Sequence, residues 1–385
     1  SVGGSLPADR NVFAASGAAA SAILAGAGGA HTVQGNLIGL RPDGQTPGAV
    51  GQAVVSSAIS AGQLLLDNTI ACTVNAVAMQ SYGGVIQNNR LGTTVSGGDP
   101  GCTTGRLSTG SGQRYSGNTF GYFNSTPVSL ASNLSGVVFR GNRIVDVDAV
   151  PFDLNGNGFT PNDADDSDTG ANGLQNYAVV SDARILDADH LQLSGTLRST
   201  ANTSFGLDFH ASSEVTRAAF GFIALANGER VSTSSVTVTT DATGLASFGP
   251  VNVAFDGSGV IGVVSTTATR LDSNGNAVET SEYGEARATY TAGSGDFVVT
   301  NTNIGGPGSL LRALLEAEAR PDGAGRDRIT FNIPGGGPHT LSTGVLTTMQ
   351  FAGKLELDGM TQPGSVANTS SRDINAQLKI DINGS

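Results

Sequence analysis

The residues best suited to chemistry lie in one short acidic segment between positions 153 and 168. Its carboxylates and amides offer only oxygen ligands, which are the ligands that Ca²⁺ takes in proteins. They are Asp153, Asn155, Asn157, Asp163, Asp165, Asp166 and Asp168. Carboxylates held this close repel one another, and a bound cation relieves the repulsion. The segment therefore predicts Ca²⁺ as a cofactor, with a solvated acidic turn as the alternative.

The segment begins like an EF-hand loop, because Asp153, Asn155 and Asn157 alternate and Gly158 follows. An EF-hand also needs a bidentate Glu at its twelfth position, where this chain has Ala164. We therefore expect an irregular oxygen-only site rather than an EF-hand.

Paired carboxylates also serve enzymes that cleave polysaccharides, usually beside an exposed aromatic ring that stacks on a sugar. Asp146, Asp148, Arg140 and Arg143 lie close in sequence and are candidates for such chemistry. The same residues are expected more simply as a salt-bridged outer face. The chain has no Trp, and its four His residues lack the spacing of a zinc site or a triad. We therefore predict that the protein is not an enzyme.

Composition limits the classes of partner. The chain has 385 residues and a net charge of −12, which disfavours nucleic acid, because phosphate binding needs clustered Lys and Arg. No run of apolar residues is long enough to span a membrane. Hydrophobic residues make up 38% of the chain and fall in short β-type runs, which favours packed strands over disorder.

The elements that must position the acidic segment are indicated by a repeated asparagine, which stands just ahead of an apolar residue. Its positions are Asn11, Asn36, Asn68, Asn89, Asn118 and Asn142. Such a period is typical of a solenoid, whose successive turns bury one another's apolar faces. An Asn at a fixed turn can stack on the Asn of the next turn and tolerates left-handed backbone. The pattern predicts a parallel β-helix.

Cys72 and Cys102 are the only cysteines, and the 30 residues between them span about one turn of this solenoid. We therefore expect them to lie on neighbouring turns and to form a disulfide, in a secreted protein.

The pattern of apolar and polar residues changes after the acidic segment. Residues 191–197 and 236–238 alternate apolar and polar side chains, and turn sequences separate such runs, which predicts an antiparallel β-sandwich. One helix is predicted after it, with Ser309 as N-cap and Pro321 at its end. Short strands such as 329–333 follow, so the helix is expected to cap the first turns of another β-helix.

Several motifs resemble a known family. They are Gly306-Pro307-Gly308-Ser309-Leu310, Ile329-Thr330-Phe331-Asn332-Ile333-Pro334, Leu357-Asp358-Gly359-Met360-Thr361-Gln362-Pro363-Gly364, Val33-Gln34-Gly35-Asn36-Leu37-Ile38-Gly39, and the stretch from Thr160 to Tyr177. They are similar to segments of large bacterial surface proteins with a CSLREA-type head, right-handed parallel β-helix repeats and Ig-like modules. The resemblance implies a secreted or cell-surface structural protein and supplies no catalytic residues.

The order of the parts differs from that family, in which the head comes first. Here a β-helix body comes first and a head comes last. The predicted fold is all-β, with right-handed parallel β-helix segments flanking an antiparallel Ig-like β-sandwich and one short capping helix. The predicted domains are 1–185, the last part of a β-helix with its acidic closing loop; 186–292, the Ig-like sandwich; and 293–385, the helix and first turns of a further β-helix.

This order predicts self-association, head to tail or in tandem copies, because both ends expose solenoid edges. The residues expected at the contact are Ser1, Asn11, Leu355, Leu357, Ile380 and Ile382. The predicted function is a structural subunit of an extracellular bacterial fibre or giant surface protein, with a cell-surface polysaccharide as a further partner. The alternative is a carbohydrate-active β-helix enzyme or a polysaccharide-binding tailspike-like module.

Overall fold

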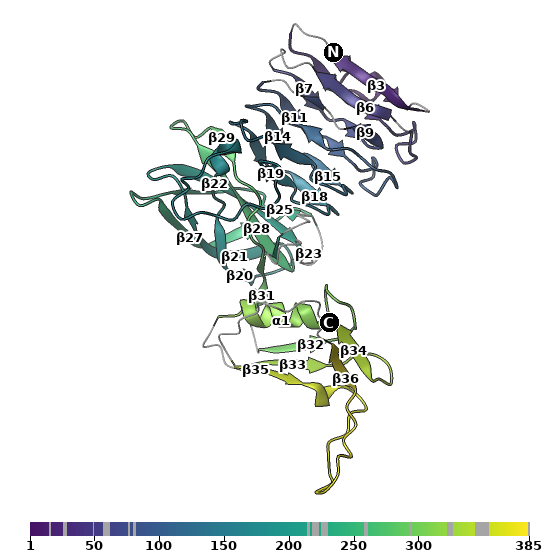
Figure 1. Ribbon diagram of the computed structural model, residues 1–385, viewed down its shortest axis with the longest axis vertical. Coiled ribbons are helices and arrows are strands. Elements are labelled where there is room, and N and C mark those ends of the chain that lie inside the picture. Colours follow the sequence, from purple (N-terminus) through teal and green to yellow (C-terminus); the bar gives the residue numbers. More distant parts are fainter. Residues whose placement is uncertain are drawn as a thin grey trace.

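A computed structural model describes residues 1–14, 17–25, 29–48, 50–56, 62–75, 78–79, 82–213, 216–217, 223–224, 230–257, 261–292, 295–321, 326–342 and 354–383. These residues form mostly β-structure with one α-helix, which confirms the prediction of an all-β protein. Three parts follow one another along the long axis (Figure 1). We name them the parallel part (residues 2–154), the antiparallel part (179–291) and the C-terminal part (296–383).

The parallel part consists of three sheets that receive successive strands in rotation, and all neighbouring strands in them are parallel. The first sheet contains β1 (Val2–Gly3), β4 (Thr32–Gln34), β7 (Leu64–Leu66), β11 (Val85–Gln87), β14 (Arg114–Ser116) and β17 (Val138–Arg140). The second contains β2 (Val12–Phe13), β5 (Leu37–Ile38), β8 (Thr69–Ile70), β12 (Arg90–Leu91), β15 (Thr119–Gly121) and β18 (Arg143–Val145). The third contains β3 (Gly17–Ala25), β6 (Val50–Ser56), β10 (Ala78–Met79), β13 (Leu107–Ser108), β16 (Val128–Leu130) and β19 (Phe152–Leu154), and β9 (Thr73–Asn75) pairs with β6. We call one passage through the three sheets a circuit.

The register of these strands places apolar side chains above one another in the interior. In the second sheet the stacked residues are Ile38, Ile70, Leu91, Phe120 and Ile144, each at most 1% exposed. Aromatic rings continue the stack, with centroids 5.5 Å apart for Phe120 and Phe139 and 4.7 Å for Phe139 and Phe152. Because full burial of such a side chain stabilises the fold by about 1.5–3 kcal/mol, each circuit depends on its neighbours.

The predicted asparagine ladder is confirmed at the turn between the first and second sheets. The Oδ1 atom of Asn68 accepts hydrogen bonds from the backbone N–H and Nδ2 of Asn36, at 2.9 and 3.1 Å. The same paired contact recurs from Asn11 to Asn142. Asn36 to Asn142 each follow a residue with positive φ, which is Gly35, Asp67, Asn88, Gly117 or Gly141. Only small or Asx residues occupy this left-handed position without large strain, which explains the residue types found there.

The antiparallel part contains two larger sheets and one hairpin. One sheet has the order β27 (Leu245–Ala254), β21 (His190–Arg198), β20 (Val179–Ile185) and β31 (Tyr290–Thr291). The other has the order β25 (Arg230–Val231), β22 (Ser204–Ser212), β28 (Val263–Leu271) and β29 (Ala277–Thr280), while β26 (Val236–Thr239) pairs with β22 and β30 (Arg287–Ala288) with β28. The hairpin joins β23 (Thr216–Arg217) to β24 (Ile223–Ala224).

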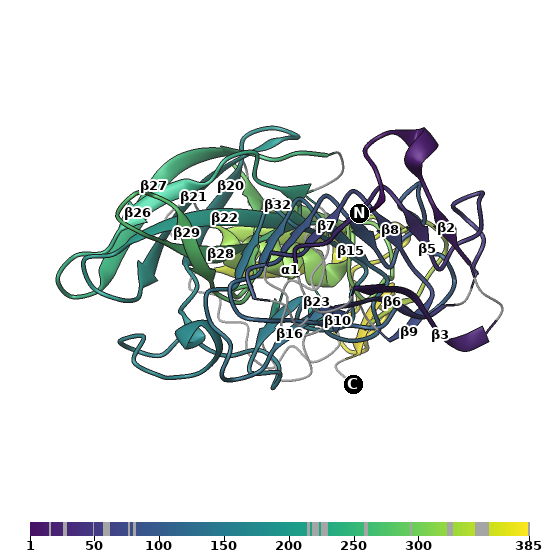
Figure 2. The same cartoon turned by 90° about the horizontal axis from the view of Figure 1, so that it is seen from above.

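The first predicted domain boundary falls directly after β20. Residues 179–185, which the prediction places in the first domain, form β20, and β20 pairs along its length with β21. The acidic segment has no clear strand pattern, so the sequence did not show that the next sheet begins directly after it. Seen from above, β26 and β27 lie to one side of the parallel part (Figure 2).

The antiparallel part covers the last circuit of the parallel part. The Thr280 N–H donates to the Val137 carbonyl at 3.0 Å, and the Thr280 hydroxyl accepts from the Phe139 N–H at 3.0 Å. Val263 and Tyr283 complete the apolar core of the parallel part. The antiparallel part therefore covers the end of the parallel part at which its three sheets finish, with β17, β18 and β19.

The C-terminal part begins with β32 (Asp296–Val299) and the helix α1 (Leu310–Ala319). The Ser309 hydroxyl accepts from the Arg312 N–H, which confirms the predicted helix N-cap. β32, β33 (Asp327–Phe331) and β35 (Leu355–Asp358) form one parallel sheet, and β34 (His339–Ser342) and β36 (Ile380–Asn383) form another. Short 3₁₀ helices occur at Pro7–Asp9, Ala171–Leu174 and Gly359–Thr361.

Helix α1 joins this part to the antiparallel part. Its Arg312 side chain is 9% exposed and donates to the carbonyls of Gly262 and Thr289 while pairing with Glu316 at 2.6 Å. Leu315 and Ala319 pack on Ala288 and Tyr290. On its other side, Leu310 and Leu314 belong to the apolar core of the C-terminal part, so the helix is held from both sides.

Candidate functional site

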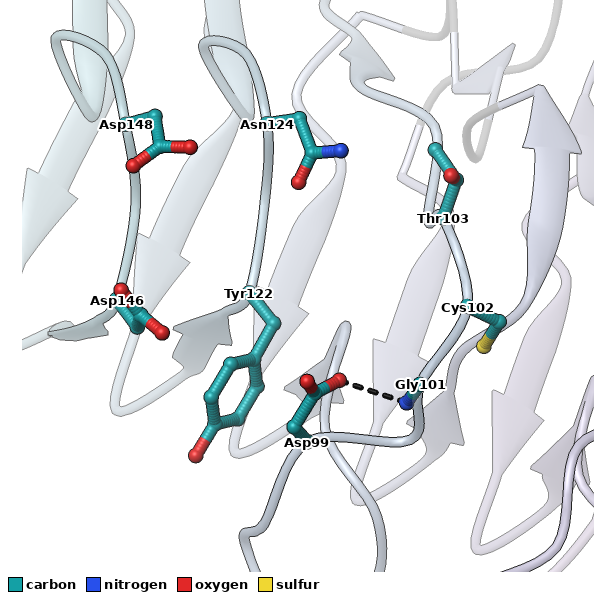
Figure 3. A pocket seen from close by; sticks show the side chains of 8 residues that line it. All are labelled: Asp99, Gly101, Cys102, Thr103, Tyr122, Asn124, Asp146 and Asp148. Carbon is teal, nitrogen blue, oxygen red and sulfur yellow. Dashed lines mark hydrogen bonds between the residues drawn. The ribbon is translucent and has the colours of Figure 1, made fainter.

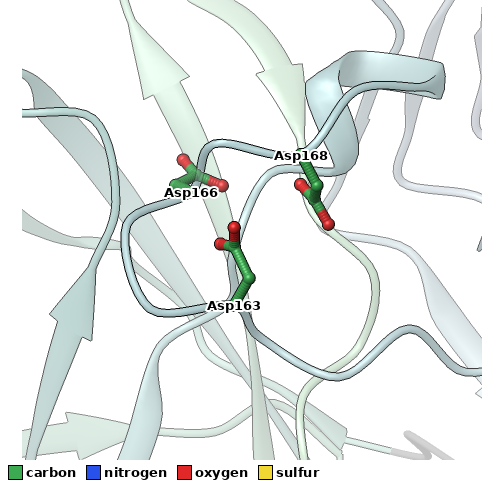
Figure 4. Close-up of side chains that lie close together, drawn as sticks. All are labelled: Asp163, Asp166 and Asp168. Atoms are coloured by element: carbon green, nitrogen blue, oxygen red, sulfur yellow. The ribbon is translucent and has the colours of Figure 1, made fainter.

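Three of the seven predicted metal ligands come together in the loop after β19 (Figure 4). Asp163, Asp166 and Asp168 each offer one carboxylate oxygen, and these oxygens lie within 4.8 Å of one another. Asp165 is exposed and stands outside the group. The predicted oxygen-rich segment therefore narrows to a cluster of three carboxylates.

The EF-hand-like residues are used by their own loop instead. The Asp153 carboxylate accepts from the N–H groups of Asn157 and Gly158 at 3.2 and 3.0 Å, and burial raises its pKa despite these bonds. Asn155 accepts from the Ala171 N–H at 2.9 Å, and Asn157 is exposed. Short Asx side chains commonly bond nearby backbone in this way, and Asp153 and Asn155 stand outside the cluster of three carboxylates.

Within the cluster the three carboxylates differ in their partners. Asp163 accepts from the Ser167 N–H and hydroxyl at 3.0 and 3.1 Å, and Asp166 accepts from the Asn176 N–H at 2.8 Å and from the Ser199 hydroxyl. In contrast, the Asp168 Oδ1 atom is buried and has no hydrogen-bond partner among the described residues.

The electrostatics follow from these contacts. Burial by itself raises the pKa of Asp163, but the hydrogen bonds from Ser167 outweigh it and hold the pKa below its ordinary value. Burial, and then the negative charges of Asp163 and Asp166, raise the pKa of Asp168. A carboxylate with an unsatisfied oxygen beside two others fits the donor set of a hard divalent cation, which Asp163, Asp166 and Asp168 would hold.

A second acidic group lines a cleft of about 300 Å³ on the parallel part (Figure 3). Asp146 and Asp148 lie in the turn after β18, and Tyr122 and Asn124 occupy the matching positions one circuit earlier. Asp99 completes the cleft and accepts from the Gly101 N–H at 2.7 Å. Figure 3 shows the Tyr122 ring between Asp146 and Asp99. Carboxylates around an aromatic ring can hold and polarise a sugar.

The arginines that the sequence groups with these aspartates point elsewhere. Arg140 forms two hydrogen bonds with Asp208, at 2.7 and 2.8 Å, and Arg143 pairs with Asp256 at 2.5 Å. Both partners belong to the antiparallel part. The prediction that Asp146 and Asp148 form a salt-bridged outer face with these arginines is therefore wrong. Arg140 and Arg143 instead join the parallel part to the antiparallel part.

Cys72 and Cys102 form a disulfide, with Cα atoms 5.2 Å apart. Cys102 also lines the acidic cleft, so the disulfide holds the loop that carries Asp99 against the circuit that contains Cys72. This loop lies between β12 and β13.

A buried carboxylate at the junction of two parts was not predicted from the sequence. Glu282 is 2% exposed and accepts from the Leu154 N–H at 2.7 Å and the Thr160 N–H at 2.8 Å. Burial, and to a smaller extent the charge of Asp153, raise the pKa of Glu282 to about 8, although the hydrogen bonds oppose the shift. A lone Glu in an irregular stretch carries no sequence signal of such a role.

The residues predicted at an assembly contact lie on or beside the first two and the last two described strands. Ser1 and Asn11 are exposed beside β1 and β2. Leu355 and Ile380 are half-buried, whereas Leu357 and Ile382 are 42% and 44% exposed. Leu357 is in register with Ile329, which is fully buried, and Ile382 with Leu341, which is 1% exposed. These side chains therefore continue the apolar rows of Ile329 and Leu341 on the last described strands.

The sequence matches no protein-family model, and no curated protein matches it. No helix in the described part of the chain is long and apolar enough to cross a membrane. The function is therefore inferred from the chemistry of these sites.

Proposed function

We propose that the parallel part is the end of a right-handed parallel β-helix, the antiparallel part an Ig-like sandwich, and the C-terminal part the start of a second β-helix. The rotation of strands through three sheets and the asparagine ladder support the first assignment. Two sheets around one apolar core, antiparallel apart from the β20–β31 pair, support the second. The resemblance to bacterial surface proteins with a CSLREA-type head belongs to the same proposal.

We propose that the protein is a structural subunit or repeat of an extracellular bacterial fibre or giant surface protein. The observation that carries this is the exposed apolar surface on the outermost described strands at both ends of the long axis. At the C-terminal end, Leu357 and Ile382 stand where the preceding circuit has buried residues. At the other end, the half-buried Val2 and Phe13 pack against the core of the parallel part.

The backbone supports the same contact. β1 and β2 each pair with one neighbour among the described strands, as do β35 and β36. An open edge pairs readily with another strand. The Asn11 Oδ1 atom also accepts no hydrogen bond from a described residue, whereas Asn36 Oδ1 accepts two. A circuit placed before Asn11 would supply the missing donors.

The distribution of exposed apolar side chains agrees with this reading. Of the fourteen large hydrophobic residues exposed in the described chain, six lie between positions 357 and 382. They include Ile374, at 89% exposure, on an arm closed by the Val366–Gln377 bridge. The arm extends beyond the last strands (Figure 1). The opposite end adds Leu6 and Val12, at 63% and 40% exposure.

The two ends are different surfaces, so a contact between them is heterologous. Such a contact need not produce a closed ring. Such a contact builds an open filament when the rotation between copies does not close a ring. Copies joined in tandem within one polypeptide would use the same contact.

Electron microscopy of the purified protein tests the proposal, which expects filaments. Leu357→Asp and Ile382→Asp place charges on the contact and should abolish them. Ile304→Asp is the matched control, because Ile304 is 63% exposed and lies outside the strand edges. Dispersed single particles of the wild-type protein at all concentrations would contradict the proposal.

A polysaccharide-binding module or carbohydrate-active enzyme is the second candidate, favoured by the acidic cleft. Release of reducing ends from a polysaccharide panel, lost in Asp146→Asn and Asp148→Asn, would support it. No binding and no turnover across the panel would count against it. An extracellular location is part of both proposals and is supported by the disulfide.

A further inference from the structure

A cleft of about 510 Å³ lies between the parallel part and the antiparallel part, separate from the two acidic groups. One wall is the outward face of the second sheet, with Arg90, Thr119 and Arg143. The other wall is formed by Val231, at the end of β25, and Asp256. Its volume falls within the range of roughly 300–1,000 Å³ that is typical of small-molecule sites.

The charged groups of this cleft are unevenly satisfied. Asp256 is fully engaged, because one oxygen accepts from Arg143 at 2.5 Å and the other from the Val231 N–H at 2.8 Å. Arg90 forms no ion pair with any described residue and is exposed. Its neighbours in the same outward row are Thr69 and Thr119, which carry no charge. A cationic side chain therefore faces the cleft, where Asp256, the carboxylate that lines the other wall, is engaged by Arg143 and the Val231 N–H.

The shape of the cleft keeps Arg90 accessible. Gly97, Gly117 and Gly141 line it, and all three have positive φ. A Cβ at Gly141 would meet no atom within 4 Å, so the space beside it is open. The half-buried Val145 adds apolar surface on which the C–H face of a sugar can pack.

We propose that this cleft binds an anionic saccharide, with Arg90 as the residue that binds its carboxylate. A guanidinium group offers a planar pair of N–H donors that matches a carboxylate. Thr119 supplies a hydroxyl group beside it. Arg143 is already held by Asp256, so it serves to position the wall of the cleft. This inference is independent of filament assembly.

Titration calorimetry of the full chain tests the assignment, with a disaccharide that carries one glucuronate and its neutral glucose counterpart as probes. The wild-type protein should bind the acidic probe and not the neutral one, and more weakly at high salt. Arg90→Ala should weaken binding about tenfold or more. Arg114→Ala is the matched control, because Arg114 is also exposed but lies on the first sheet.

Thermal unfolding should show that Arg90→Ala leaves the fold unchanged, since the side chain is exposed. Equal binding by Arg90→Ala and the wild-type protein would overturn the proposal. So would equal affinity for the two disaccharides, or no binding of the acidic one at concentrations up to about 10 mM.

Discussion

The Glu282 carboxylate accepts a hydrogen bond from the backbone N–H of Leu154, at 2.7 Å and 128 residues away in the sequence. Leu154 ends the last strand of the parallel part, and Glu282 belongs to the antiparallel part. One side chain therefore connects a part built of parallel sheets to a part whose strands are mainly antiparallel. The contact is almost fully shielded from water.

Glu282→Ala should destabilise the protein, because it removes both oxygens that accept from the N–H groups of Leu154 and Thr160. Leaving such a buried donor unsatisfied costs about 1–3 kcal/mol. Urea unfolding measures the change, with the exposed Glu285→Ala as control. Equal loss in both variants would contradict the role of the junction.

The raised pKa of Glu282 predicts a pH dependence of stability. The folded protein holds the Glu282 proton up to about pH 8, while the unfolded chain releases it near 4.5. The folded state binds more protons in this window, so the free energy of unfolding should fall as pH rises toward 8.

His210 gives the opposite slope at lower pH and sets the range of the measurement. Burial lowers its pKa to about 4, so the unfolded state binds more protons between 4 and its ordinary value of 6.5. Stability curves are therefore best compared between pH 6.5 and 8. The slope there should vanish in Glu282→Gln, and its persistence would assign it to another group.

Asn89→Ala should destabilise the protein by about 2–5 kcal/mol, because it leaves several buried groups unpaired. The Asn89 side chain donates to the Leu65 carbonyl at 2.7 Å and accepts from the Asn68 N–H at 2.9 Å. Asn11→Ala is the comparison, since Asn11 is exposed at the end of the ladder. Chemical unfolding should show a much smaller loss for Asn11→Ala, and equal losses would contradict the ladder's contribution.

Ca²⁺ should raise the unfolding temperature if it binds Asp163, Asp166 and Asp168. A ligand at one hundred times its Kd adds about 2.7 kcal/mol to stability. Asp168→Asn should remove this response and Asp165→Asn should retain it, because Asp165 lies outside the cluster. Differential scanning calorimetry with EDTA or Ca²⁺ measures the effect. An unchanged unfolding temperature of the wild-type protein would show that the cluster is a solvated acidic turn.

Elements with a repeated local signal were predictable from the sequence. Each ladder Asn stands two residues before an apolar residue, and the same turn geometry recurs from Asn36 to Asn142, so the pattern accumulates along the chain. The helix was predictable as well, because Ser309 and Pro321 mark its limits through local backbone chemistry.

Contacts between the parts were not predictable, because nothing periodic connects their residues. Arg140 reaches Asp208 across 68 residues, and Glu282 reaches Leu154 from a segment without a motif. In the acidic segment, composition alone did not separate Asp153, which bonds its own loop, from Asp168, which retains an unsatisfied oxygen. That distinction depends on backbone geometry.

The spacing of the ladder has an evolutionary consequence. Neighbouring ladder asparagines are 21 residues apart from Asn68 to Asn89 and 32 apart from Asn36 to Asn68, yet they form the same hydrogen bonds. Insertions and deletions are therefore tolerated between asparagines while the ladder itself stays constant. An in-frame duplication that begins and ends at a ladder Asn would add a complete circuit with its hydrogen bonds in place. Unequal recombination between such repeats could thus change the length of the molecule without a new fold.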